Sequence, residues 1–529
     1  MSYALVMIAF ILFLCIIAER FSGKMGMPAL ILFMCLGMLF GSDGILKIPF
    51  ENYDIAEKIC TISLSVIMFY GGFNTKWETA KPIAREAALL STLGVVGTTL
   101  LTAGFCYLVF ALSFAESFLV GAVLGSTDAA SVFSILRKKK LNLKNGTASL
   151  LEIESGSNDP FAYMLTIIGL SLIKGESLSS IPYMVFAQLV YGIAIGVAMA
   201  FVGIAILTKT KLIAEGLDTI FVIGLVLAAY ALPACIGGNG FLSVYLMGII
   251  LGNSKIRNKQ VLIPFFDGVT GLAQILIFFL LGLLAFPHKI PAVIPTAVLV
   301  ALFMMLVARP VVVFLLMKPF GASVRQCLLV SWSGLRGAAS IVFAIFIVAG
   351  GSRLSYDLYH IVFMVSLLSV AVQGALLPKV SEKLGMVDAA SDVRKTFNDY
   401  QDESSLTMMQ LYIPAGHNWE NKLLEEAHMP QGSLVLMIKR SGETIIPKGN
   451  TKILAEDSLI FSVPSYNSGE DVHLEEIRIT ARHAWKNQTI ESLELPKEML
   501  IALIKRGDEN VIPQGKTVIR EGDIVVVCK

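Results

Sequence analysis

The strongest constraint on this chain is a series of apolar runs, each long enough to cross a bilayer, that fills its first part. From Met1 to about Pro378 these runs are separated only by short polar loops. The hydrocarbon core of a bilayer needs roughly 20 apolar residues in a helix. With 55% hydrophobic and 16% charged residues, the chain lacks the polar surface that a soluble protein of 529 residues requires. We therefore predict a polytopic, all-α membrane protein.

We expect about thirteen spanning helices, allowing about 1.5 Å of rise per residue. The second and ninth candidates are short, so the count is open by one. Met1–Ile17 lacks the basic region and the cleavage site of a signal peptide, and is interpreted as the first span. The expected segments lie near residues 2–18, 27–41, 58–73, 86–110, 116–136, 149–173, 182–208, 217–233, 239–252, 262–286, 292–317, 325–349 and 356–379.

The loops between these segments alternate between basic and nearly neutral. Basic loops stay in the cytoplasm. This predicts a bacterial inner-membrane protein with its N-terminus outside and its polar C-terminal part inside. One set of loops holds Arg20, Lys24, Lys76, Lys81, Arg85, Arg137, Lys138, Lys139, Lys140, Lys144, Lys209, Lys211, Lys255, Arg257, Lys259, Lys318 and Arg325; the other holds little beyond Lys47, Lys58, Lys174, Lys289 and Arg353.

Composition also excludes several classes of function. A formal net charge of +2 is too balanced for a nucleic-acid surface. The seven cysteines lie mostly inside apolar runs without metal-type spacing, and the six histidines form no cluster. No nucleophile–base constellation is recognisable, so we expect neither an enzyme nor a bound cofactor.

Ionisable residues occur inside three of the expected spans, where each costs at least about 2.5–3.5 kcal/mol. In the fifth, Thr127 and Asp128 lie in a stretch of Gly, Ala and Ser that holds a helix weakly. A break there would expose backbone carbonyls and two half-helix ends, which are the groups that build ion sites in transporters.

The sixth span carries Glu154, Ser155, Asn158 and Asp159, followed by Pro160. The i,i+4 spacing places Glu154 above Asn158 and Ser155 above Asp159, on one side of the helix. We expect Glu152 nearer to the cytoplasmic end.

The twelfth span carries Arg336, which cannot lose its proton and needs a carboxylate partner. We expect that partner to be Glu154, in a structural ion pair, and we expect Arg309 to reach the cytoplasmic surface. One such pair leaves Asp128 and Asp159 free to bind protons or cations. The simpler alternative is that all these charges only hold helices together.

The TD pair, the ESGSNDP motif and the SGLRGAAS motif occur in this order and resemble the NhaP-type branch of the monovalent cation:proton antiporters. The resemblance covers about residues 1–380. It implies inverted repeats in which the fifth and twelfth segments are crossed, broken helices, in a core that moves against a dimerising scaffold.

The resemblance also implies roles for individual residues. Asp159 would hold either the cation or the proton, and Asn158 would be its neutral neighbour, which predicts electroneutral exchange. Arg336 would pair with the glutamate. Where the family often has proline after the TD pair this chain has Ala129, so the break rests on small residues. The implied cation- and proton-binding residues are Thr127, Asp128, Glu154, Ser155, Asn158 and Asp159, of which Asp159, Asp128, Thr127 and Ser155 would contact the transported alkali cation.

The remaining part of the chain is charged and repeats itself. We expect a linker at 381–405 and two related domains at 406–466 and 467–529, because the sequence from Trp419 recurs from Trp485 at an offset of 66 residues. Each repeat reads as a short helix followed by strands. Each has only about 55 residues, too few for a robust core, so the two should pack together or across a dimer.

The repeats resemble tandem RCK C (TrkA-C) domains, which are α+β regulatory units. The resemblance allows cyclic di-AMP binding at a dimer interface, and a dimerising or pH-responsive module without a ligand is an equal alternative. No GxGxxG follows a strand, so binding of NAD or ATP is disfavoured.

Together these features predict a regulated potassium/proton antiporter, acting as a homodimer. Sodium/proton exchange at the same site is the closest alternative. A ligand-gated cation channel is less favoured, because no TVGYG-like filter is present. A sensor without transport would not need the three groups of buried charges.

Overall fold

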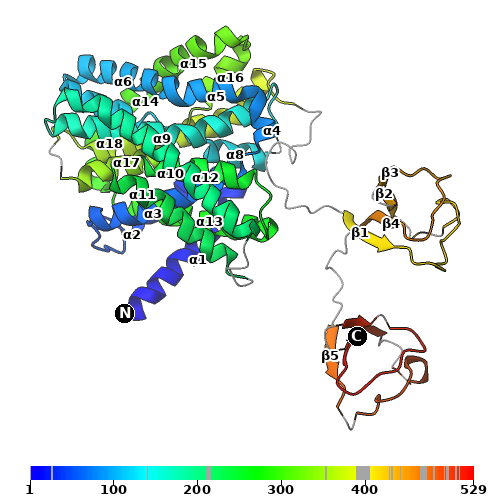
Figure 1. Cartoon of the computed structure of the whole chain (residues 1–529). Helices are drawn as coiled ribbons and strands as arrows, with labels where there is room; N and C mark the ends of the chain where they lie inside the picture. Colours follow the sequence, from blue (N-terminus) through cyan, green and yellow to red (C-terminus); the bar gives the residue numbers. More distant parts are fainter. Residues whose placement is uncertain are drawn as a thin grey trace. The chain divides into compact units, whose positions relative to one another are not determined.

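The computed structural model (Figure 1) comprises two compact units, residues 1–399 and 400–529, which are treated separately below. It describes residues 2–25, 28–139, 141–209, 216–351, 354–388, 406–427, 429, 433–440, 443–464, 474–480, 483–493, 495, 500–506, 509–511 and 513–528.

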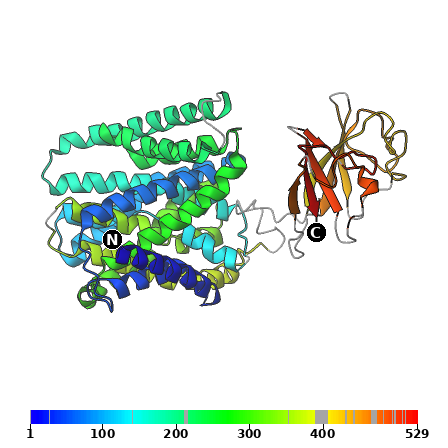
Figure 2. The same ribbon diagram turned by 90° about the horizontal axis from the view of Figure 1, so that it is seen from below.

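The first unit is built of helices that lie side by side, most of them nearly parallel or antiparallel (Figure 2). Eight helical stretches are long and apolar enough to cross a membrane, and four shorter apolar helices accompany them in the described part of the chain. The predicted helical membrane fold is confirmed. The α-helices are α1 (Ser2–Met25), α2 (Ala29–Phe40), α3 (Tyr53–Asn74), α4 (Trp77–Ala80), α5 (Ala84–Leu89), α6 (Val95–Phe110), α7 (Phe114–Val123), α8 (Ala129–Lys138), α9 (Thr147–Ile173), α10 (Ile181–Lys209), α11 (Asp218–Cys235), α12 (Gly240–Gly252), α13 (Lys259–Leu283), α14 (Ile290–Phe303), α15 (Arg309–Met317), α16 (Val324–Trp332), α17 (Ala338–Ala349), α18 (Leu358–Leu368) and α19 (Ala375–Lys383).

Three of the long helical stretches contain π-helical turns, which are frequently found at functional sites. They are η2 (Leu90–Gly94), η5 (Met304–Ala308) and η7 (Ser369–Gly374), which join α5 to α6, α14 to α15 and α18 to α19. Short 3-10 turns precede α5, α10, α14 and α16.

Two expected spans are interrupted in the middle. Residues 124–128 separate α7 from α8, and residues 333–337 separate α16 from α17. The two interruptions lie against each other, because the backbone N–H of Asp128 donates to the carbonyl of Leu335 at 2.7 Å. These are the fifth and twelfth segments, so the broken helices are where the small residues and the buried charges predict them.

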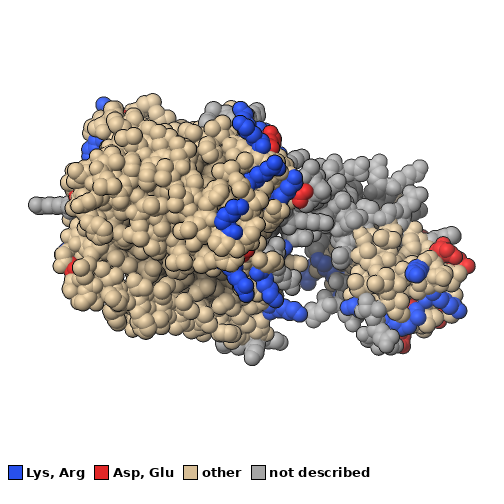
Figure 3. Space-filling view, turned by 90° about the horizontal axis from the view of Figure 1, so that it is seen from above, with Lys and Arg blue, Asp and Glu red and all other residues tan. Residues whose placement is uncertain are grey.

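Glycines allow several of these helices to approach closely. A methyl group added at Gly282 of α13 would lie 2.1 Å from the carbonyl oxygen of Met34, and one added at Gly37 of α2 would lie 2.1 Å from that of Phe279. The backbones of α2 and α13 are therefore in direct contact, as is common where membrane helices pack through small residues. Lys and Arg side chains gather along one end of the helical unit (Figure 3), as alternating basic loops require.

The second unit contains two antiparallel sheets with the same strand order. The first is β1 (Leu406–Tyr412), β4 (Ser458–Pro464), β2 (Leu434–Arg440) and β3 (Glu443–Ile445); the second is β5 (Leu474–Arg478), β8 (Ile524–Cys528), β6 (Leu500–Arg506) and β7 (Glu509–Val511). Both have a bulge at equivalent positions, after Val435 and after Ile501. The internal repeat is thus a structural repeat. The short helix expected at the start of each repeat is replaced, in the described residues, by turns and by the 3-10 turn η8 (Ile490–Ser492).

An arginine–aspartate ion pair stabilises each sheet. Arg440 donates to both carboxylate oxygens of Asp457 at 2.8 Å, and Arg506 donates to those of Asp523 at 2.9 and 2.7 Å. The aspartates are buried and also accept a backbone N–H three residues earlier. Burial by itself raises the pKa of Asp457, but these hydrogen bonds and the attraction of Arg440 outweigh it and lower the pKa. The Arg506 hydrogen bonds are the main cause of the lowered pKa of Asp523.

Substitution of Gly282 by alanine should destabilise the helical unit, because the new methyl group would push α13 away from α2. We expect a loss of about 1–3 kcal/mol, seen as a lower midpoint of thermal unfolding in detergent. Gly224→Ala in α11 is the control, since a methyl group there meets no atom within 4 Å. Equal midpoints for the two variants would show that α2 and α13 do not touch as described.

The two arginine–aspartate pairs should make the sheets acid-sensitive. Because the pKa of each aspartate is lowered in the folded state, the pair stabilises the sheet fully above the unfolded pKa of about 3.9. That stability is lost as the pH falls through the lower, folded pKa. Hydrogen exchange of β4 and β8, measured in the full chain after incubation at graded acid pH, should show this loss. A variant with Asp457→Asn and Asp523→Asn should lack this acid-induced loss of protection. If its hydrogen exchange depended on pH as in the wild-type chain, the two pairs would not be the cause of the acid sensitivity.

Candidate cation and proton site

Asp159 lies in the middle of α9, beside the interruption between α7 and α8. The hydroxyl group of Ser126, in that interruption, donates a hydrogen bond to Oδ1 of Asp159. The carboxylate borders a cavity of about 210 Å³. Among the described residues Asp159 has no basic partner within ion-pair distance. A carboxylate inside a membrane protein without a fixed counter-ion needs a mobile one.

Two neighbours on α9 hold the interrupted segment in place. Ser155 donates from its hydroxyl group to the carbonyl of Thr127 at 2.8 Å, and the side-chain amide of Asn158 donates to Oγ1 of Thr127 at 2.5 Å. Both residues are buried. The helix that carries Asp159 therefore also fixes the backbone opposite it.

The half-helix ends at the crossing are neutralised by two charged side chains. Nη1 of Arg336 donates to the carbonyls of Gly125 and Ser126 at 3.0 and 2.8 Å, at the C-terminal end of α7. Asp128 accepts the backbone N–H of Ser131 at 3.3 Å, at the N-terminal end of α8. Cations stabilise helix C-terminal ends and anions stabilise N-terminal ends. Asp128 also lies against the start of α17, where a methyl group on Gly337 would be 2.3 Å from its Cβ.

Glu154 pairs with Arg309, whose Nη2 lies 2.5 Å from Oε1 of the carboxylate. Both side chains are buried, at 1% and 4% exposure. The expected ion pair between Glu154 and Arg336 is therefore wrong, and so is the expectation that Arg309 extends to the surface. Arg336 is occupied by the carbonyls of the interrupted helix, and Arg309 supplies the second deep positive charge.

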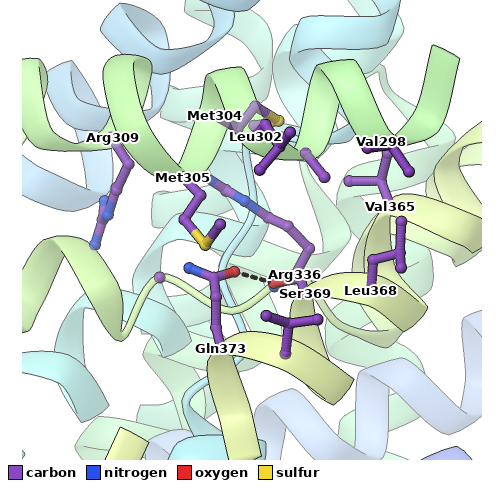
Figure 4. A pocket seen from close by; sticks show the side chains of 13 residues that line it. Val298, Leu302, Met304, Met305, Arg309, Arg336, Val365, Leu368, Ser369 and Gln373 are labelled. Atoms are coloured by element: carbon purple, nitrogen blue, oxygen red, sulfur yellow. Dashed lines mark hydrogen bonds between the residues drawn. The ribbon is translucent and has the colours of Figure 1, made fainter. Parts of the chain in front are cut away.

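Figure 4 shows both arginines at a second cavity, of about 140 Å³, which is otherwise mostly apolar. At its floor the hydroxyl group of Ser369 donates to Gln373 at 2.5 Å and accepts the backbone N–H of Arg336 at 3.0 Å. The π-helical turn η7, which carries Ser369 and Gln373, thus holds the interruption between α16 and α17 by a hydrogen bond to its backbone.

The surroundings of Asp159 differ between the two directions along α9. Glu152, about two turns before Asp159, lines the cavity together with Asn74 at the end of α3. Tyr163, about one turn after Asp159, belongs to a cluster of aromatic rings. Its ring centroid lies 5.0 Å from that of Phe241, 5.8 Å from that of Phe343 and 5.9 Å from that of Phe346.

These rings come from two groups of helices. Tyr163, Phe343 and Phe346 belong to α9 and α17, which carry or flank the site. Phe241 belongs to α12, and its centroid lies 5.0 Å from that of Tyr230 in α11. This aromatic cluster is therefore a seam between α9 and α17 on one side and α11 and α12 on the other.

The structure brings together four of the predicted residues, Thr127, Asp128, Ser155 and Asp159, at the wall of the cavity of about 210 Å³. Asn158 lies behind them, and Glu154 belongs to the arginine pair. Sequence reasoning missed Ser126 as a direct partner of Asp159, although its place next to the TD pair was a signal. It also missed residues that other helices bring to the cavity, including Tyr245 of α12 and Gln274 of α13.

A crossing of two interrupted helices, beside a carboxylate that has no basic partner among the described residues, is typical of a secondary transporter. Residues 8–383 match the family model described as "Sodium/hydrogen exchanger, transmembrane", and residues 408–467 and 474–528 match the TrkA-C domain. The chain belongs to the sodium/hydrogen exchanger family and carries two TrkA-C domains, as the motifs predicted.

The chain is similar to several named antiporters. It is 32% identical to the K(+)/H(+) antiporter NhaP2 of Shewanella baltica, over 84% of this chain and 78% of the relative. It is 27% identical to the Na(+)/H(+) antiporter ApNhaP of Aphanothece halophytica, over 65% and 67% of the two chains. The fold is that of the sodium proton antiporter MjNhaP1 of Methanocaldococcus jannaschii, with a TM-score of 0.63 and 24% identity over 70% of this chain and 99% of that one.

The Glu154–Arg309 pair predicts the following pattern of stability. Arg309→Met alone should lower the free energy of unfolding by about 3–5 kcal/mol, because it leaves a buried carboxylate unpaired. Adding Glu154→Leu should restore most of the loss in thermal unfolding of the purified protein. The matched control combines Arg336→Met with Glu154→Leu. If stability recovered in the variant with Arg336→Met and Glu154→Leu, but not in the one with Arg309→Met and Glu154→Leu, the Glu154–Arg309 pairing would be contradicted.

Proposed function

We propose that this protein exchanges potassium ions for protons, one for one, by alternating access at Asp159. The observation that carries the proposal is the position of that carboxylate. It lies at a cavity wall, with a hydroxyl group as its hydrogen-bond donor and with the two deep arginines engaged elsewhere.

Competition at Asp159 would couple the two fluxes. A carboxylate at this depth is costly while it is charged and uncompensated. A bound proton neutralises it, and so does a bound alkali cation, but one excludes the other. The oxygens that line the cavity beside it, from Ser126, Thr127, Asp128 and Ser155, are suitable ligands for a hard cation.

The seam of aromatic rings supports alternating access. Rings from α9 and α17 meet rings from α11 and α12 about one turn of α9 beyond Asp159. A shift of the site-bearing helices against α11 and α12 would part the rings on that side and close the cavity on the other. Movement of one helix group against another around a fixed site is the usual form of such transport.

Electroneutral exchange follows from Asn158. It stands next to Asp159 and its amide bonds to Thr127, so it contributes no proton of its own. Each passage of the site then carries one charge in either direction.

The similarity to relatives favours potassium. Those that match most of this chain, at 29% and 32% identity, are named K(+)/H(+) antiporters. Sodium is the second candidate, because a relative at 27% identity is named an Na(+)/H(+) antiporter. We further propose a homodimer in the bacterial inner membrane, with the N-terminus outside and the TrkA-C domains in the cytoplasm as regulatory units.

Asp159→Asn should leave the protein folded and reduce exchange to the level of empty vesicles, because the amide cannot alternate between proton and cation. The measurement uses the full chain in liposomes with a pH dye inside, to which potassium, sodium or choline chloride is added. Asp54→Asn, an exposed acid at the start of α3, is the control and should exchange normally. Exchange retained in Asp159→Asn would refute the site; a sodium response without a potassium response would correct the ion.

A further inference from the structure

The loop between α8 and α9 joins the two halves of the ion site. α8 begins directly after Asp128, and α9 carries Asp159. A displacement of residues 141–146, in the connection between these helices, would therefore move the two sides of the cavity relative to each other. The structure shows what this loop contacts.

The chain segment that follows α19 pairs with this loop as a short antiparallel ladder. The backbone N–H of Lys144 donates to the carbonyl of Met386 at 2.9 Å, and that of Asp388 donates to the carbonyl of Asn142 at 2.9 Å. Leu143 and Val387 are directly opposite each other between these bonds. The ammonium group of Lys144 adds a bond to the carbonyl of Gly385 at 3.0 Å.

Apolar side chains of the ladder pack against α8. Leu143 and Met386 are 4% and 3% exposed, and both belong to the apolar cluster that contains Val132, Ile135 and Leu136 of α8. A change in the ladder is therefore transmitted by direct packing to α8, the helix that begins directly after Asp128.

The ladder also lies at the covalent connection to the regulatory units. Asp388 is the last described residue before β1 begins at Leu406. Among the described residues, a pull or a rotation that the TrkA-C domains exert along the chain would act first on Asp388 and Val387, and only then on α19.

We propose that residues 142–144 and 385–388, here named the latch, couple the TrkA-C domains to the ion site. With the latch closed, α8 is held and the site keeps its shape; when the tail opens the latch, α8 is released and cation binding weakens. This inference rests on the proposed function and names a route for its regulation.

A first test opens the latch without touching the site. Asp388→Pro removes the N–H that Asn142 accepts, and Asp388→Ala, which keeps this N–H, is the matched control. In liposomes containing the full chain, Asp388→Pro should raise the potassium concentration for half-maximal exchange about five-fold or more relative to Asp388→Ala. The maximal rate should change less. Equal half-maximal concentrations for the two variants would overturn the proposal.

A second test closes the latch covalently and does not depend on a proline. Leu143 and Val387 form a non-hydrogen-bonded antiparallel pair, whose Cα atoms are about 4.5 Å apart, within the range of a disulfide. Leu143→Cys and Val387→Cys are introduced in a chain whose seven cysteines are replaced by alanine. Arg440→Gln, which removes the partner of Asp457, serves as the perturbation of the tail.

Arg440→Gln should change the half-maximal potassium concentration in the reduced protein and have no effect once the disulfide has formed. An equal change in both states, or none in either, would overturn the latch. Exchange by the chain without these substitutions separates a failure of the latch from a failure of the proposed function. If it exchanges potassium normally while these tests fail, only the latch is wrong; if it shows no exchange, the proposed function fails first.

Discussion

The arrangement of this protein depends on how charge is compensated where two interrupted helices cross. The interruption between α7 and α8 and that between α16 and α17 leave unpaired carbonyls and N–H groups in the middle of the membrane part. Arg336 binds carbonyls at the end of α7, and Asp128 caps the start of α8 while it lies against the start of α17. Without these side chains the crossing would leave backbone groups unsatisfied in an apolar medium, at a cost of several kcal/mol.

Because Arg336 and Asp128 stabilise the crossing, their positions determine which charged side chain remains for transport. Arg309 compensates Glu154, so both deep arginines are occupied, and among the described residues Asp159 has the Ser126 hydroxyl group as a hydrogen-bond donor and no basic partner. The same helix, α9, carries Asp159 towards the cavity and Asn158 and Ser155 towards the interrupted backbone. The same residues therefore set both the geometry of the site and the crossing of the interrupted helices. A displacement of α8 would change both.

Much of this was accessible from the sequence, and the misses have a physical reason. Apolar runs define helices, small residues define where α7 and α16 end, and an acid inside an apolar run is visible as such, so Asp128 and Asp159 could be found. Pairing between distant helices is different. Arg309 and Arg336 both lie in apolar surroundings, and only the rotation and crossing of their helices decides which one reaches Glu154. The same holds for Ser126, whose hydroxyl group points to Asp159 because the helix is interrupted beside it. In the tail the 66-residue repeat correctly predicted two equivalent sheets, whereas the expected short helices are replaced by turns in the described residues.

The central claim is that one carboxylate holds either a proton or a cation. It is tested most directly by counting protons released when potassium chloride is added to purified protein in weakly buffered detergent. The account predicts release of up to one proton per chain, saturating with potassium, absent with choline and absent in Asp159→Asn. Potassium binding to the wild-type chain without release of a proton would contradict it.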